Sequence, residues 1–183
     1  MQAPSQFIIR NNENKLQLNE EVLEIIKNST NPQFFLFYGK TRTGKSTTLN
    51  QLIRGNLDTR KYKNKKPFET LDSLDSVTKG CQIYGPVKAS ELIKKHKIKK
   101  KKNFEDFDIF FCDTEGLFSL NGQSKFLIPG ILTLLQICTV SVIMIKTVPD
   151  QNTITQIGSE IQISKLLQQI NSEIKSPLVS IYI

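Results

Sequence analysis

The sequence predicts an α/β fold in three layers: a mostly parallel sheet with helices on both of its faces. Two patterns lead to this prediction. Short continuous apolar runs, typical of strands covered on both faces, alternate with longer segments whose apolar residues recur at helical spacing. The length of 183 residues suits one ordinary domain, and the chain contains no internal repeat.

The first 54 residues are expected to alternate strands and helices. Asn19 is the predicted N-cap of the first helix, because Glu20 and Glu21 follow it and suit a first turn. The pair Asn28-Ser29 marks the end of that helix. The predicted elements are a strand over 7–9, a helix from 20 to about 28, a buried strand over 34–38 and a helix over 45–54.

The later part of the chain continues this alternation. Strands are predicted over 81–87, 107–112, 138–146 and 178–183, and helices over 124–136 and from 149 to about 174. Residues 126–145 carry no charge, and 20 such residues could span a bilayer. Pro129-Gly130 and the β-branched second half of this stretch favour a helix followed by a buried strand instead.

The positive charge is concentrated in two stretches. The net charge is +8, yet residues 60–66 hold five basic residues and residues 94–102 hold seven. Without these twelve, 13 basic residues face 17 acidic ones, which argues against a general nucleic-acid binder. Residues 94–102 could contact an acidic membrane surface, RNA or an acidic partner, and a solvated hairpin tip is the simpler interpretation. The seven lysines are Lys94, Lys95, Lys97, Lys99, Lys100, Lys101 and Lys102.

The cysteine pattern favours a reducing compartment. Cys81, Cys112 and Cys138 are odd in number and widely spaced, and His96 is the only histidine. This pattern supports neither a disulfide framework nor a zinc site, and the two later cysteines suit a core. The first residues lack the charged and apolar regions of a signal peptide. We therefore expect a cytoplasmic protein, with peripheral contact to membranes as an option.

The segment between the strand over 34–38 and the next helix matches G-x-x-x-x-G-K-[ST]. Its glycines permit backbone conformations that let successive N–H groups surround phosphate oxygens. Lys45 is expected to bridge the β- and γ-phosphates, and the Ser46 hydroxyl to ligate Mg²⁺. The alternative is a helix-opening turn without a ligand. The predicted nucleotide-binding residues of this loop are Gly39, Lys40, Thr41, Arg42, Thr43, Gly44, Lys45, Ser46 and Thr47.

Two further segments complete the expected site. Asp113-Thr114-Glu115-Gly116 comes directly after the apolar run over 107–112. Asp113 is expected to hold Mg²⁺ through water, and the Gly116 N–H to meet the γ-phosphate. Thr78 is the best-placed threonine for a mobile switch that ligates Mg²⁺. The alternatives are a polar turn after a strand and a solvated turn threonine.

Together, the words R-T-G-K-S (42–46), T-K-G (78–80) and D-T-E-G-L (113–117) resemble the guanylate-binding protein and atlastin family of large dynamin-related GTPases. The resemblance runs from about Pro4 to Ile183. It implies that residues 1–183 are the N-terminal portion of one Ras-like G domain with the P-loop NTPase architecture. Since the chain stops inside its last predicted strand, we expect a truncation that removes the base-recognition Arg-Asp and the helical domain.

The resemblance also implies catalytic roles. Leu117 stands where Ras-type GTPases carry the glutamine that positions the attacking water. The family instead uses an arginine finger within its phosphate loop, which corresponds to Arg42. Ser76 would orient the water, with Glu115 assisting through a water bridge. Lys40-Thr41 departs from the apolar-aromatic pair usual in this family.

These expectations define a Mg²⁺-dependent GTPase that hydrolyses the β–γ phosphoanhydride of GTP. Ser46, Thr78 and Asp113 form its expected metal set. A nucleotide-dependent homodimer through the G domain is the expected assembly, and nucleic acid is not an expected partner. Two alternatives stay open: a truncated binding module that pairs with full-length relatives, and a P-loop ATPase of another lineage.

Overall fold

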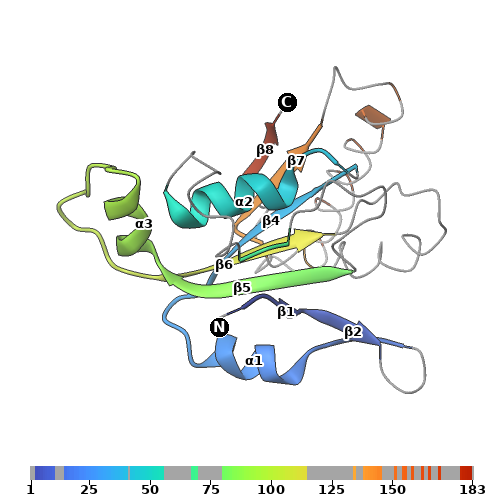
Figure 1. Ribbon diagram of the computed structural model, residues 1–183, viewed down its shortest axis with the longest axis horizontal. Coiled ribbons are helices and arrows are strands. Elements are labelled where there is room, and N and C mark those ends of the chain that lie inside the picture. Colours follow the sequence, from blue (N-terminus) through green and yellow to red (C-terminus); the bar gives the residue numbers. More distant parts are fainter. Residues whose placement is uncertain are drawn as a thin grey trace.

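The computed structural model describes most of the predicted strands and the first two predicted helices (Figure 1). The described residues are 3–10, 15–40, 42–55, 67–69, 80–114, 138–145 and 178–182, with the single positions 134, 151, 154, 155, 158, 162, 165 and 169. Within them, one sheet has six strands in the order β1-β5-β6-β4-β7-β8. The strands are β1 (Ser5–Gln6), β4 (Gln33–Gly39), β5 (Cys81–Lys88), β6 (Asp108–Thr114), β7 (Val140–Met144) and β8 (Leu178–Tyr182).

The centre of the sheet is parallel and one edge is antiparallel. β6, β4, β7 and β8 run parallel to one another, whereas β5 pairs antiparallel with both β6 and β1. The predicted mostly parallel α/β sheet is therefore confirmed. A second, two-stranded sheet joins β2 (Ile8–Arg10) to β3 (Leu16–Leu18), and the sequence analysis did not predict β3.

Helices cover both faces of the large sheet, as predicted. The side chains of β4 alternate: Phe34 and Leu36 enter one hydrophobic cluster, and Phe37 enters the other. The first cluster packs against α1 (Glu20–Lys27), and the second against α2 (Lys45–Arg54) and α3 (Ala89–Lys95). Figure 1 shows α1 and α2 on opposite sides of the sheet.

The ends of the first two helices agree with the sequence signals. The Asn19 side chain accepts a hydrogen bond from the Glu21 N–H at 3.1 Å, which confirms Asn19 as the N-cap of α1. The C-cap of α1 is Asn28. α2 spans the predicted residues, between Gly44 and Gly55, both of which adopt left-handed backbone conformations.

The connection between β5 and β6 differs from its prediction as a plain hairpin tip. The two strands do pair antiparallel, but their connection begins with α3, so the lysine run starts inside a helix. Buried Ala89 and partly buried Leu92 pack against the cluster beneath α2, and this tertiary contact explains the helix.

β6 is longer than predicted at its carboxyl end. Asp113 and Thr114 are its last two residues rather than the start of a turn, and both are fully buried. Asp113 pairs with Phe37 of β4, and the Thr114 hydroxyl donates to the Phe37 carbonyl at 3.1 Å. These bonds to β4 continue the strand into the motif.

All three cysteines are buried and free, which confirms the predicted core positions of Cys112 and Cys138. Burial raises the pKa of Cys138 to about 12, and a hydrogen bond with Cys81 together with burial raises the pKa of Cys112. Buried thiols of this kind are unreactive.

The two predicted later helices fall mostly outside the described residues. Leu134 is helical and buried, and the isolated described positions between 151 and 169 are helical. None of the helices in the described part of the chain has the length and apolar character needed to cross a membrane.

Candidate nucleotide-binding site

The phosphate loop connects the carboxyl end of β4 to α2, and its glycines are required by the surrounding backbone. Gly39 has φ +136°, and a Cβ there would lie 2.2 Å from the Met144 carbonyl oxygen of β7. Gly44 has φ +87° and open space around it. Arg42 also has a positive φ, 62°, which is uncommon for a residue with a side chain and typical of ligand-binding loops. Both glycines of the motif therefore adopt positive φ values, as the glycine spacing of the motif predicts.

The amino end of α2 is arranged to receive an anion. Gly44 is the N-cap and gives no side-chain hydrogen bond, and the first turn contains no acidic residue. The first N–H groups of a helix lack intrahelical acceptors, and the helix dipole places partial positive charge there. Both features favour a phosphate group at this point.

Lys45 lies inside the loop. Its side chain is buried, and Nζ donates to the carbonyl oxygens of Gly39 at 3.3 Å and Lys40 at 2.9 Å. A second hydrogen bond lies within the loop, because the Thr43 hydroxyl donates to the Lys40 carbonyl at 2.9 Å. An ammonium group is thus already held where phosphate oxygens would enter.

Ser46 and Asp113 bring two oxygen ligands together from separate elements. The Ser46 hydroxyl lies 2.5 Å from Asp113 Oδ2, although the residues are 67 positions apart in the chain. Asp113 is fully buried at the end of β6, and Ser46 is in the first turn of α2. Hydroxyl and carboxylate oxygens are the ligands that Mg²⁺ prefers, so these residues fit the expected metal.

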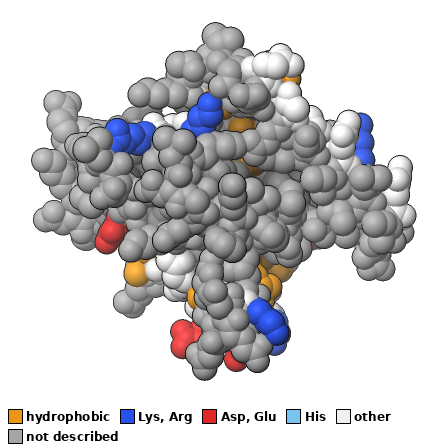
Figure 2. Space-filling view, turned by 90° about the vertical axis from the view of Figure 1, so that its right-hand side faces the viewer, with side chains coloured by type: hydrophobic (Ala, Val, Ile, Leu, Met, Phe, Trp, Pro, Cys, Tyr) orange, Lys and Arg blue, Asp and Glu red, His pale blue; other side chains and the backbone are white. Residues whose placement is uncertain are grey.

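The described members of the predicted site gather at one end of the sheet, where β4 and β6 finish (Figure 1). They are Gly39, Lys40, Arg42, Thr43, Gly44, Lys45, Ser46, Thr47 and Asp113. The Arg42 side chain is exposed there. Figure 2 faces this end and shows lysine and arginine side chains at its surface. Thr41, Ser76, Thr78, Glu115 and Gly116 lie outside the described residues.

The sequence analysis missed two hydrogen bonds that join α2 to the backbone of Phe68. Asn50 is buried; its Nδ2 donates to the Phe68 carbonyl at 2.8 Å, and its Oδ1 accepts from the Phe68 N–H at 2.9 Å. Phe68 itself is fully buried in the cluster beneath α2. The signal was present, since Asn50 is a polar residue beside the apolar positions Leu49 and Ile53.

Comparison with known proteins agrees with this geometry. The family described as guanylate-binding protein, N-terminal domain, matches residues 13–172, which include the phosphate loop and the whole of β6. The curated proteins give no match. The match covers well over half of the chain, and the matched family is one of dynamin-like GTPases that bind GTP. The chain therefore belongs to the guanylate-binding protein family and carries its N-terminal G domain.

Proposed function

We propose that this chain binds GTP with Mg²⁺ and hydrolyses the β–γ phosphoanhydride. The observation that carries the proposal is the convergence of Lys45, Ser46 and Asp113 around the phosphate loop. Family membership supports guanine as the base. Mg²⁺, when bound, would neutralise charge on the β- and γ-phosphate oxygens.

The residues of the chain divide the work between binding and catalysis. Lys45 and the amino-end N–H groups of α2 bind the phosphates. Ser46 and Thr78 would ligate the metal, and Asp113 would hold it through water. Arg42 neutralises charge that develops on the transferring phosphoryl group. Its exposed side chain at the rim of the loop is compatible with this role. Ser76 and Glu115 orient the attacking water.

The comparison of two loop variants tests the proposal. Lys45→Ala should abolish binding of a fluorescent GTP analogue, because it removes the ammonium held within the loop. Arg42→Ala should bind the analogue as the wild type does but lower kcat about a thousandfold, the scale of an arginine finger. Arg42→Lys is the matched control, and it should restore only part of the rate, because lysine lacks the planar fork of arginine.

Equal turnover in Arg42→Ala would contradict the assignment of Arg42. Full nucleotide binding without any turnover in the wild type would favour the alternative of a binding module. ATP that displaces the bound analogue as well as GTP does would favour an ATPase.

We further propose that the protein acts in the cytoplasm and forms a homodimer through its G domain when loaded with GTP. The phosphate loop joins β4 to α2 at one end of the sheet (Figure 1), and the Arg42 side chain is exposed there, where a second copy could reach it. Light scattering with a non-hydrolysable GTP analogue should show twice the monomer mass, and with GDP the monomer mass. A monomer in both states would contradict the dimer.

A further inference from the structure

The end of the sheet opposite the phosphate loop carries the lysine segment, residues 94–102 (Figure 1). This segment begins in the last turn of α3 and leads back to the start of β6, whereas the phosphate loop and Asp113 lie where β4 and β6 finish. All seven of its lysines are exposed. The segment is therefore too far from the phosphate loop to serve the bound nucleotide, and its charge needs another explanation.

The lysines have no acidic partner among the described residues. Two of the seven side chains make contacts within the described structure: Lys95 Nζ donates to the Ile53 carbonyl at 3.2 Å, and Lys100 Nζ lies 4.8 Å from the centre of the Phe104 ring. Five positive charges thus remain in solvent without a contact in the described structure.

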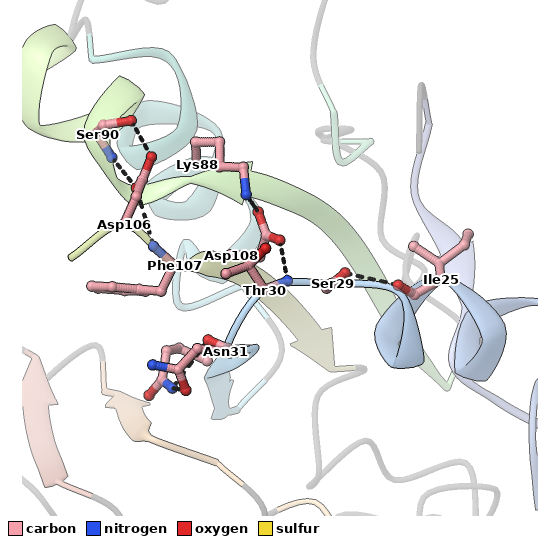
Figure 3. Close-up of polar contacts among 10 residues, drawn as sticks. Ile25, Ser29, Thr30, Asn31, Lys88, Ser90, Asp106, Phe107 and Asp108 are labelled. Carbon is pink, nitrogen blue, oxygen red and sulfur yellow. Dashed lines mark hydrogen bonds and ion pairs between the residues drawn. The ribbon is translucent and has the colours of Figure 1, made fainter.

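Two carboxylates of the same connection are engaged elsewhere (Figure 3). Asp106 accepts hydrogen bonds from the Ser90 N–H at 3.0 Å and the Ser90 hydroxyl at 2.7 Å. Asp108 pairs with Lys88 at 3.0 Å and accepts from the Thr30 N–H at 2.7 Å. These bonds fix both ends of the connection that carries the lysine segment, and they keep the two acids away from its charges.

The turn after α3 is a defined structure rather than a loose loop. Lys97 has φ +56°, its N–H donates to the Lys94 carbonyl at 3.2 Å, and the Ile98 N–H donates to the Ile93 carbonyl at 2.9 Å. This is the Schellman arrangement, in which the left-handed position usually belongs to glycine. A lysine there keeps a positive charge at a conformational cost. Ile98, directly after it, is 60% exposed.

From this arrangement we propose that the lysine segment is a docking surface for an anionic phospholipid membrane. Lysine clusters of this size attract acidic headgroups, and one exposed isoleucine among them can enter the interface beside the acyl chains. RNA fits less well. The segment has no arginine for bidentate contacts, and the nearby Phe104 ring is partly buried beneath Lys100 rather than free to stack on bases. This inference goes beyond GTP hydrolysis and does not depend on it.

Vesicle flotation of the full chain tests the proposal. The probes are vesicles of phosphatidylcholine alone and with a minority of phosphatidylserine. The wild type should bind only the second kind. The variant K99Q/K101Q/K102Q should bind it at least about tenfold more weakly, because each lysine near an anionic leaflet contributes a severalfold factor. The side chains of these three lysines make no hydrogen bond or ion pair in the described structure, so the fold should survive.

Matched variants separate a site from a general charge effect. K63Q/K65Q/K66Q removes the same charge from the other basic stretch and should leave vesicle binding within about twofold of the wild type. Ile98→Ser should weaken binding, whereas Ile154→Ser, at another exposed isoleucine, should not. An equal loss in the two lysine triples would overturn the proposal. A second result would also overturn the proposal: the wild type binds single-stranded RNA but not vesicles, and K99Q/K101Q/K102Q abolishes the RNA binding.

Discussion

The two ends of the sheet treat charge in opposite ways. At the phosphate end, the amino end of α2 offers backbone N–H groups, and Lys45 is buried against carbonyl oxygens of the loop. At the opposite end, carboxylates bind backbone N–H groups and lysines stand in solvent. The first arrangement suits a small anion that is held in a fixed geometry. The second suits an extended anionic surface, which needs no fixed geometry.

One helix connects these two ends. α2 follows its N-cap Gly44 in the phosphate loop and is ended by its C-cap Gly55, which lies beside Lys95 of α3. At its carboxyl end, the Leu52 carbonyl lies 2.7 Å from His96 Nε2, and the Ile53 carbonyl accepts from Lys95. The helix dipole thus favours a phosphate at one end and a cation at the other. The comparison teaches that the two basic regions differ in structural role, although both appear as positive charge in the sequence.

The largest expected effect is at the phosphate end, at Gly39. Gly39→Ala places a Cβ 2.2 Å from the Met144 carbonyl, and neither backbone can move freely within the sheet. We expect a loss of about 4 kcal/mol or more in the free energy of unfolding, measured by urea denaturation. Gly44→Ala is the matched control: it has open space and should lose only about 1–2 kcal/mol for its positive φ. Equal losses would contradict the close approach of the loop to β7.

The second effect is at the opposite end, at Asp108. Asp108→Ala leaves the Thr30 N–H and Lys88 without their acceptor. We expect the free energy of unfolding, measured by urea denaturation, to fall by about 2–3 kcal/mol. Lys88→Gln breaks the same ion pair at its half-exposed partner, where solvent replaces the contact. It should therefore lower the free energy of unfolding by no more than about 1 kcal/mol. A Lys88→Gln loss as large as that of Asp108→Ala would show that the ion pair, rather than the backbone bond, matters.

The sequence was a good guide where the signals are local. Continuous apolar residues predicted β4, glycines at both ends bounded α2, and Asn19 with two acids marked the start of α1. The phosphate-loop motif also predicted a site that unites Ser46 with Asp113. Each of these depends on residues close together in the chain or on a motif with a known partner.

Other features depend on contacts between distant residues, which no local pattern records. β3 has three residues and exists because it pairs with β2. α3 needs Leu92 packed beneath α2 and Asp106 at its amino end, and the adjacent lysines concealed it. The need for glycine at position 39 arises from Met144, on another strand. Ser76, Thr78, Glu115 and Gly116 stay predictions, since they fall outside the described residues.

The smallest expected effect is a pH dependence at Asp106. Its hydrogen bonds from the Ser90 hydroxyl and N–H hold the pKa of the Asp106 carboxyl below its ordinary value of about 3.9. Because the folded pKa is lowered, the stabilisation is complete above about pH 5 and disappears as the pH falls through the folded pKa. Asp106→Asn should therefore be less stable than the wild type at neutral pH, and this difference should shrink below about pH 4.

Urea denaturation of both proteins at neutral and acidic pH measures that difference. Glu105→Gln is the matched control, because Glu105 is an exposed neighbouring acid without a hydrogen bond in the described structure. It should show no such pH-dependent difference from the wild type. If the Asp106→Asn difference were the same at both pH values, the carboxylate charge would not contribute to the cap of α3. The conformation of the turn after α3, which carries part of the lysine segment, would then depend on the backbone hydrogen bonds of Lys97 and Ile98 alone.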